Sequence, residues 1–254
     1  MTDAAYAQLP CSRCPARTTT LCASLADPQM PELYRLAEDR RFAAGDAILV
    51  QEQAADWVFS LRRGHAALTR LTSDGRRQIL AFLFPGDFFG LTSEDRYHYG
   101  VTAIADAATC RFDRAALEDL TRRFPEMDRK LRFTLTRAMD ASFELLFSLG
   151  RKDALQKVAS FIWYVGYRMR KLGESGNPVH LPMRRADIAD FLGLSTETVS
   201  RTLTSLRENG VIELVGATDI RIADLAALRS IGVVVAEPAP FVHADPDYYP
   251  RKGR

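Results

Sequence analysis

One stretch of the chain, from Arg184 to Asn209, constrains the fold more than any other, because it has the pattern of two short helices joined by a tight turn. Apolar residues recur at helical spacing from Ile188 to Leu192. Gly193 follows them, where the end of a helix favours a residue without a β-carbon. Ser195 can cap the second helix by accepting a hydrogen bond from a free backbone N–H. The interval of about three residues between the helices predicts a helix-turn-helix.

The second helix of this pair has one apolar and one polar face. Val199, Leu203 and Leu206 repeat at positions i, i+4 and i+7 and form a stripe that can pack. The polar residues on the opposite face are Glu197, Ser200, Arg201 and Thr204. Glutamate can accept from the cytosine amino group, arginine can bind both guanine acceptors, and serine can bond to several base edges. This face is suited to the major groove of DNA, although a merely solvated helix pair would show the same pattern.

The composition is that of an ordinary globular protein: 254 residues, 47% hydrophobic and 26% charged, enough for two domains. Apolar runs such as ILAFLF are far shorter than the roughly 20 residues that span a bilayer. The start, MTDAAYAQLP, lacks the charged and apolar regions of a signal peptide, so we expect a cytoplasmic protein with no membrane partner. No P-loop, nucleophile elbow or HExxH motif occurs, and we expect no enzymatic activity.

A net charge of only +2 means that any DNA-binding surface has to be local. Arginines in and beside the helix pair could contact phosphates, which gives affinity without sequence information. The expected contacts with the DNA backbone are Arg184, Arg185, Ser195, Thr196 and Thr204.

The chain has four cysteines, and three of them lie within one short segment, CSRCPARTTTLC. Cys11, Cys14 and Cys22 are expected on a loop, because the segment has neither helical nor strand periodicity, while Cys110 lies far off in sequence. In a reducing compartment, clustered cysteines indicate metal or redox chemistry more than structural disulfides. Their spacing suits a cluster or a zinc ion, and a regulatory disulfide is a further reading.

Short strand-like runs follow from about Phe42 to Phe112, separated by glycine and aspartate. This punctuation predicts a compact antiparallel domain with hairpins. The runs are AILVQ, WVFSLRRG, AALTRLT, RQILAFLF and VTAIADAATCRF.

The longest helical pattern runs from about Pro125 to Gly150 and carries an apolar seam with steps of 4, 3, 4 and 3 residues. Such a seam predicts a parallel dimer, and the alternative is a helix that packs on its own β-domain. The seam consists of Leu135, Met139, Ser142, Leu146 and Leu149. Ser142, small and polar at mid-seam, should make the dimer weaker than an all-leucine seam would.

A further amphipathic helix begins near Ala154, with a core stripe of Leu155, Val158, Phe161, Ile162 and Val165. After the helix-turn-helix, VIELV and IRIAD flank GATD as a small hairpin, so the C-terminal unit is predicted to be a winged helix. The tail from Glu237 onward is rich in proline and charge, and we expect it to be mobile.

Two of these stretches resemble one known family. ETVSRTL resembles the recognition helix of the CRP/FNR family of bacterial regulators, and its Glu-x-x-Ser-Arg signature resembles the FNR branch. The spacing from FAAGDAILVQEQAADWVFSLRRGHA into FPGDFFG resembles the cyclic-nucleotide-binding-like β-roll of the same family. The resemblance covers nearly the whole chain except the tail.

The resemblance implies an α+β protein with a double-stranded β-helix (jelly-roll) sensor domain, a long dimerisation helix and a C-terminal winged helix-turn-helix. The implied divisions are a cysteine-rich segment at 1–30, the β-roll at 31–123, the dimerisation helix at 124–150, the DNA-binding domain at 151–236 and the tail at 237–254.

By the same resemblance, Glu197, Ser200 and Arg201 would read bases of double-stranded DNA, and the protein would act as a homodimer that contacts RNA polymerase. A two-fold dimer sets its reading helices about 34 Å apart, so the target should be a pseudo-palindrome. Its half-sites would be similar to the FNR-type TTGAT.

Cys11, Cys14, Cys22 and Cys110 resemble the cluster-binding set of FNR-type oxygen sensors. The resemblance implies a 4Fe–4S cluster that favours the DNA-binding dimer without oxygen and is dismantled by oxygen. Two alternatives within the family stay open: a zinc-containing regulator, and a FixK-like regulator whose cysteines are vestigial.

A ligand-binding or haem-binding sensor module without a DNA role is the alternative from another class, with His65 and His98 as candidate haem ligands. A cyclic nucleotide is not expected. The cAMP-binding relatives carry a glutamate and an Arg-Ser pair after the glycine-rich turn, whereas here LTSEDRYHYGVTA contains Arg96 but no such pair.

Overall fold

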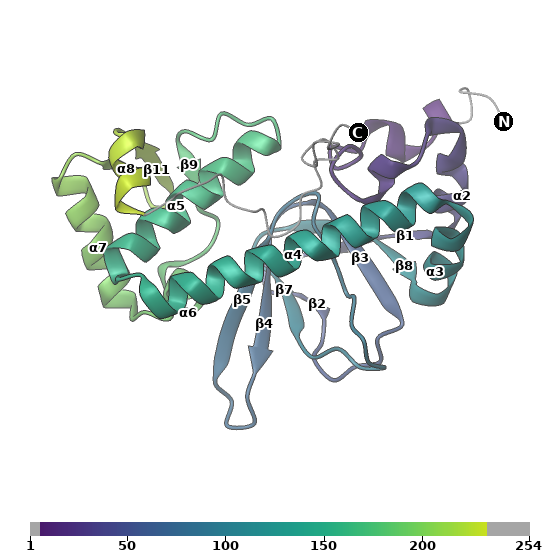
Figure 1. Ribbon diagram of the computed structural model, residues 1–254, viewed down its shortest axis with the longest axis horizontal. Helices are drawn as coiled ribbons and strands as arrows, with labels where there is room; N and C mark the ends of the chain where they lie inside the picture. Colours follow the sequence, from purple (N-terminus) through teal and green to yellow (C-terminus); the bar gives the residue numbers. More distant parts are fainter. Residues whose placement is uncertain (1–5, 233–254) are drawn as a thin grey trace, which may run out of the picture. The chain divides into compact units, whose positions relative to one another are not determined.

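The computed structural model describes residues 6–232, so the predicted mobile tail at 237–254 lies outside the described residues. The chain divides into two compact units (Figure 1). Of the described residues, the first contains 6–66 and Leu83–Met139, and the second contains Ala67–Phe82 and 140–232.

The first unit begins with three short 3-10 turns and one helix that together enclose the N-terminal cysteines. These elements are η1 (Pro10–Arg13), η2 (Leu21–Ser24), η3 (Asp27–Gln29) and α2 (Met30–Leu36). Leu21, Leu25, Met30 and Leu33 are buried in the core of this unit. Burial of these side chains anchors the cysteine segment to the β-domain.

All paired strands of the first unit run antiparallel to their neighbours. Its strands are β1 (Ala37–Phe42), β2 (Ala47–Leu49), β3 (Trp57–Arg63), β6 (Phe88–Phe89), β7 (Gly100–Ala103) and β8 (Ala107–Asp113). β1, β8, β3 and β6 form a sheet in that order, and β2 pairs with β7. Helix α3 (Arg114–Arg123) follows β8, and Asp113 caps it by accepting from the Ala116 N–H at 2.9 Å.

The sequence-based division into strands was wrong at one place. VTAIADAATCRF was treated as one run, but it forms two strands with different partners, because the chain bends at Ile104 and Ala105. The backbone carbonyl of His65 accepts hydrogen bonds from both of these N–H groups and fixes the bend. β1 and the two-residue β6 were not predicted at all.

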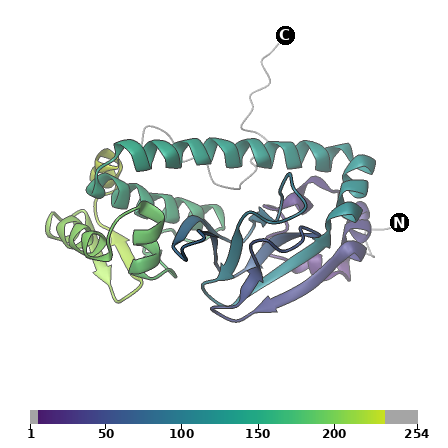
Figure 2. The ribbon, with the colours of Figure 1, turned by 90° about the horizontal axis from the view of Figure 1, so that it is seen from below.

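Helix α4 (Pro125–Arg151) is continuous over 27 residues (Figure 2). Its predicted extent was correct within one residue at the C-terminal end. No helix in residues 6–232 is long and apolar enough to cross a membrane.

The second unit contains a strand pair and the C-terminal helices. Its elements are β4 (Ala66–Leu71), β5 (Arg77–Leu83), α5 (Ala154–Lys171), β9 (Val179–His180), α6 (Arg185–Leu192), α7 (Thr196–Glu208), β10 (Ile212–Val215), β11 (Asp219–Ile222) and α8 (Leu225–Ile231). β10, β11 and β9 form an antiparallel sheet, so the predicted wing hairpin is present and gains a third strand.

Helix α5 is more deeply buried than an amphipathic stripe predicts. Val158, Phe161, Ile162 and Val165 are buried as expected, and so is nearly every other residue up to Met169. The reason is that α7, α8 and β9 all contact this helix. A helix surrounded in this way forms the centre of the winged-helix fold.

Candidate functional site

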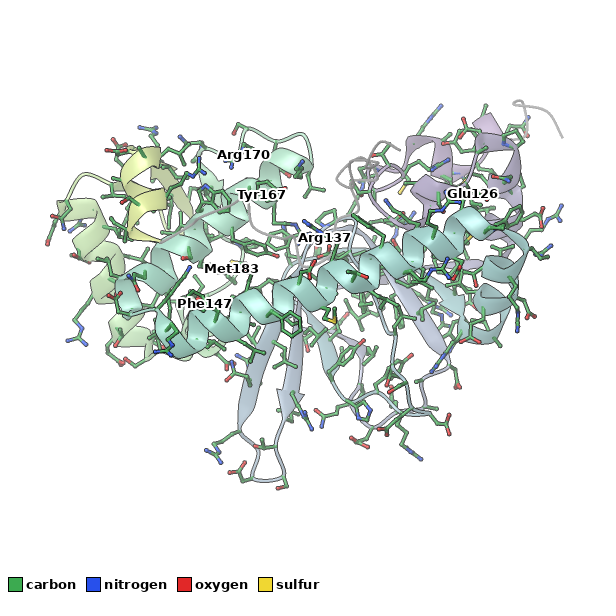
Figure 3. All side chains as sticks on the ribbon, in the orientation of Figure 1. Glu126, Arg137, Phe147, Tyr167, Arg170 and Met183 are labelled. Carbon is green, nitrogen blue, oxygen red and sulfur yellow. The ribbon has the colours of Figure 1, made fainter. Side chains whose placement is uncertain are left out.

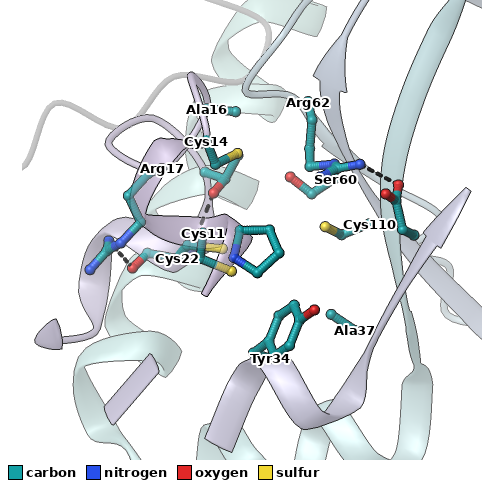
Figure 4. A pocket seen from close by; sticks show the side chains of 13 residues that line it. Cys11, Cys14, Ala16, Arg17, Cys22, Tyr34, Ala37, Ser60, Arg62 and Cys110 are labelled. Carbon is teal, nitrogen blue, oxygen red and sulfur yellow. Dashed lines mark hydrogen bonds and ion pairs between the residues drawn. The ribbon is translucent and has the colours of Figure 1, made fainter. Parts of the chain in front are cut away.

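The four cysteines, although distant in sequence, line one cavity of about 80 Å³ in the first unit (Figure 4). Each is partly buried, and none is in a disulfide. Other residues that line the cavity include Arg17, Tyr34, Asp39, Ser60 and Arg62. The structure therefore brings together all four sulfurs that the sequence singled out.

The N-terminal part of the cavity is shaped by tight turns. The Cys14 N–H donates to the Cys11 carbonyl at 3.2 Å, and Thr20 accepts from the Cys22 N–H at 3.2 Å as the cap of η2. Arg17 holds the loop between them, since its guanidinium donates to the carbonyls of Cys22 at 2.5 Å and Leu25 at 2.7 Å. These contacts fix a loop that has no regular secondary structure of its own.

Cys110 lines the cavity on the side of the sheet. It lies on β8 between two strands, opposite Asp39 of β1 and Ser60 of β3. The register of β3 against β8 shifts between Leu61 and Arg63, so Arg62 occupies a bulge. There its guanidinium forms an ion pair with Asp39. Neither Arg62 nor Asp39 was predicted, since no sequence pattern marks them.

The environment of the sulfurs disfavours free thiolates. Burial, with the neighbouring Cys22 and Cys14, raises the pKa of the Cys11 thiol to about 11. Burial is also the main cause that raises the pKa of Cys110 to about 12 and that of Cys22 above its ordinary value. Reactive redox cysteines have lowered pKa values, so these thiols are poorly suited to disulfide exchange. A metal that displaces the protons would be needed to hold them as thiolates.

The four cysteine thiols are the candidate metal ligands of this cavity. Among residues 6–232, no group of three or more His, Cys, Asp or Glu side chains is close enough to hold one metal ion. The four thiols instead surround a shared space. Four cysteines around one space are a donor set that an iron–sulfur cluster or a zinc ion can use.

The predicted helix-turn-helix is formed by α6 and α7. Gly193 ends α6 in the left-handed conformation, with φ of 63°, and Ser195 caps α7 by accepting from the Thr198 N–H at 3.1 Å. Both local signals in the sequence were therefore correct. Val199, Leu203 and Leu206 are buried, so the apolar face of α7 packs as predicted.

The three expected base-reading residues lie on the exposed face of α7. Glu197, Ser200 and Arg201 are all exposed. Backbone N–H donation at the helix start, the Ser195 hydroxyl and Arg201 lower the pKa of Glu197, which therefore stays ionised. The Ser200 hydroxyl donates to the Thr196 carbonyl at 2.9 Å, which leaves its lone pairs free to accept.

The expected DNA-backbone residues differ in their surroundings. Thr196 is exposed and Thr204 is partly buried. The Arg184 side chain is 78% exposed while it pairs with Asp187, so it can still reach solvent. Arg185 is half-buried, and its buried Nη1 has no hydrogen-bond partner.

An apolar stripe on α4 is open to solvent. Leu135, Met139 and Leu146 of the predicted seam are 47%, 52% and 65% exposed, and Ser142 is exposed as well. Leu149 is half-buried, and a β-carbon on Gly193 would lie 3.7 Å from its methyl group. Two aromatic residues that the seam pattern missed extend the stripe: Phe143, and Phe147 on the second half of α4 (Figure 3).

The residues considered for other ligands have ordinary partners. Arg96 donates to the Glu52 carbonyl at 2.5 Å, and His98 is 3.2 Å from Glu94. His65 contacts the edge of Phe84, with ring centroids 5.3 Å apart.

Comparison with known proteins is consistent across the chain. Residues 156–231 match the Crp-like helix-turn-helix domain family, and residues 39–124 match the cyclic nucleotide-binding domain family. Transcriptional activator protein FnrL of Cereibacter sphaeroides is 35% identical over 86% of this chain and 90% of its own length. Nitrogen fixation regulation protein FixK of Bradyrhizobium diazoefficiens is 35% identical over 81% of this chain and 86% of its own length.

A solved structure supports the same relationship. FixK2 from Bradyrhizobium japonicum has a TM-score of 0.72 and 32% sequence identity, covering 79% of this chain and 99% of that one. FNR-type and FixK-type proteins are thus about equally similar to this chain, and similarity alone does not separate the two types. The chain belongs to the CRP/FNR family of DNA-binding transcription regulators, which are not enzymes.

Proposed function

We propose that this protein is an oxygen-responsive, homodimeric transcription activator in which Cys11, Cys14, Cys22 and Cys110 hold a 4Fe–4S cluster. The observation that carries the proposal is the shared cavity, since three cysteines of the N-terminal loop and one of a central strand surround the same space. A cluster of this type supplies an oxygen-sensitive centre with an anionic, thiolate-bound surface. The chain's own part is to gather the four donors and to exclude most of the water around them.

The two alternatives for the cysteines make different predictions. A structural zinc ion would use the same four donors and would make the protein indifferent to oxygen. A FixK-like protein needs no cysteine cavity at all. The convergence of four sulfurs, held in part by the Arg17 contacts, supports a bound centre over vestigial cysteines.

The output of the proposed sensor is the exposed face of α7. Glu197, Ser200 and Arg201 are proposed to read base edges in the major groove, and the basic and hydroxyl residues around them to contact phosphates. The exposed apolar stripe of α4 is proposed to pack against the same helix of a second copy. Dimerisation would present two reading helices to a pseudo-palindromic, TTGAT-like site, where the activator would contact RNA polymerase.

Anaerobic purification followed by iron and sulfide assays tests the proposal. We expect about four iron and four sulfide per chain, with a broad visible absorption, as a cluster bound by four cysteines requires. We also expect specific DNA binding under argon that is lost after exposure to air. A colourless protein that holds zinc and no iron would contradict the cluster. Equal DNA binding by a metal-free protein with and without air would establish the FixK-like alternative.

A further inference from the structure

We propose that Arg62 and Asp39 form a charge pair that sets the reduction potential of the centre bound by the four cysteines. The inference rests on the proposed function and adds two residues that are not ligands. Both line the cysteine cavity, and they are joined by an ion pair drawn in Figure 4. They would act as positioning and charge-setting residues.

The backbone places Arg62 at the cavity by an irregularity in the sheet. Leu61 is opposite Thr109 and Arg63 is opposite Ala108, so one residue too many is fitted into β3 at this point. A bulge of this kind redirects the extra side chain. Arg62 consequently shares the cavity with Ser60 and Cys110, whereas Arg63 is exposed.

The hydrogen bonding of Arg62 is incomplete. One terminal nitrogen is paired with Asp39, but the Nε–H is buried and has no partner. A buried N–H without an acceptor is costly, and in a native site it indicates an acceptor that belongs there. The sulfur atoms of a cluster are acceptors of this kind, and hydrogen bonds to them are among the factors that set cluster potentials.

Arg17, the other arginine of the cavity, has a different role. Its terminal nitrogens are committed to the carbonyls of Cys22 and Leu25 and to Asp27, while its Nε–H, like that of Arg62, is buried without a hydrogen-bond partner. Arg17 therefore holds the loop in shape. Arg62 makes no such contact with the cysteine loop, and Asp39 lies directly opposite Cys110 across β1 and β8. Arg62 thus brings a positive charge to the cavity, and Asp39 brings a negative charge beside Arg62.

Opposite charges at one site have opposite effects on a redox centre. A nearby cation stabilises the more negative, reduced form, and a nearby anion destabilises it. Loss of Arg62 should lower the reduction potential, and loss of Asp39 should raise it. If the pair were only structural, both losses would weaken cluster binding and neither would shift the potential in an opposed sense.

The experiment compares Arg62→Met and Asp39→Asn in the full chain, loaded anaerobically. Reduction potentials are measured by mediated redox titration under argon, together with iron per chain. We expect each variant to change the ratio of reduced to oxidised centre at fixed potential about fivefold, in opposite directions, which is about 40 mV for a one-electron couple. Arg63→Met is the matched control and should match the wild type.

Arg62→Lys separates charge from hydrogen bonding, because lysine keeps the charge but lacks the planar guanidinium. We expect the reduction potential of Arg62→Lys to lie between that of Arg62→Met and that of the wild type. Wild-type protein with a full cluster and equal potentials in all variants would overturn the charge pair and leave the proposed function standing. Shifts of the same sign in Arg62→Met and Asp39→Asn would also overturn it. Wild-type protein that binds no iron would instead overturn the proposed function itself.

Discussion

The cysteine cavity and the reading helix are built in opposite ways. The proposed reading helix is α7, which forms a pair with α6. This pair is specified within 26 consecutive residues, where a left-handed glycine, a serine cap and one apolar stripe determine the turn and both faces of α7. The cavity is assembled from the N-terminal loop, from α2 and β1, and from two strands, β3 and β8, that lie far from that loop in sequence. The proposed sensor and the proposed output are therefore encoded in separate parts of the sequence.

Cys22→Ser is expected to have the largest effect on the cavity. The variant should lose its iron, and anaerobic DNA affinity should fall more than tenfold, because three thiolates and a hydroxyl hold a cluster poorly. The winged helix should remain folded, as circular dichroism would show. Ala23→Ser, one residue along η2, is the control and should retain iron. If Cys22→Ser kept a full complement of iron, the assignment of this ligand would be wrong.

Leu146→Glu tests whether the exposed apolar stripe of α4 is the dimer interface. Two copies of the new carboxylate would face each other in a parallel dimer, which should weaken association by about 3 kcal/mol, or on the order of a hundredfold. Sedimentation of the anaerobic protein measures this. Glu144→Lys changes a charge off the apolar stripe and should leave the dimer intact. An unchanged dimer in Leu146→Glu would place the dimer interface elsewhere.

Arg201→Ala affects the reading helix alone. It should cost about 1–3 kcal/mol of discrimination at one base pair of each half-site and leave iron content unchanged. Arg207→Ala, near the end of the same helix, should weaken binding to all sequences about equally. Competition assays with substituted half-sites distinguish the two patterns. Unchanged sequence preference in Arg201→Ala would contradict the assignment of α7.

Asp187→Asn is expected to have the smallest effect. The carboxylate is 5% exposed, and although burial opposes ionisation, hydrogen bonds from Arg184 and Arg77 lower its pKa. A lowered folded-state pKa contributes stability above the unfolded value of about 4, and the contribution is lost as the pH falls through the folded value. The variant should therefore unfold about 1–2 kcal/mol more easily at pH 7, and its difference from the wild type should become smaller at pH 3.

Urea denaturation at both pH values measures this difference. Glu208→Gln, on an exposed carboxylate whose nearest cation is 3.8 Å away, is the control and should change stability little. A difference between Asp187→Asn and wild type that is equally large at both pH values would show that shape, and not charge, is responsible.

Local signals in the sequence were reliable for the reading helix and weak for the cavity. The roles of Gly193, which ends α6, and Ser195, which caps α7, could be predicted because helix capping depends only on residues that are close in sequence. β1 went unrecognised because its sequence, AEDRRF, has no apolar alternation and its middle residues are exposed. The partners of Cys110 could not be predicted, since they depend on strand register, and the position of Arg62 depends on a bulge that has no sequence marker.

The α4 seam falls between these cases. Helical spacing correctly identified an apolar stripe with Leu135, Met139 and Leu146, but the heptad pattern passed over Phe143 and Phe147, which are among the most exposed apolar residues of the helix. The spacing of apolar residues alone does not show which side of the α4 stripe packs against other residues of the same chain. Leu149, at the other flank, lies beside the turn at Gly193.

The place of Cys110 in the middle of a sheet has a consequence for conformational entropy. Any centre that joins it to Cys22 closes a loop of about 90 residues, and a cross-link of that size restricts the unfolded chain by about 4–5 kcal/mol. The three cysteines near the N-terminus would be tied to the sheet in the same way. Bound metal would therefore act as a reversible cross-link, and its loss would increase the conformational freedom of the unfolded chain and so destabilise the fold.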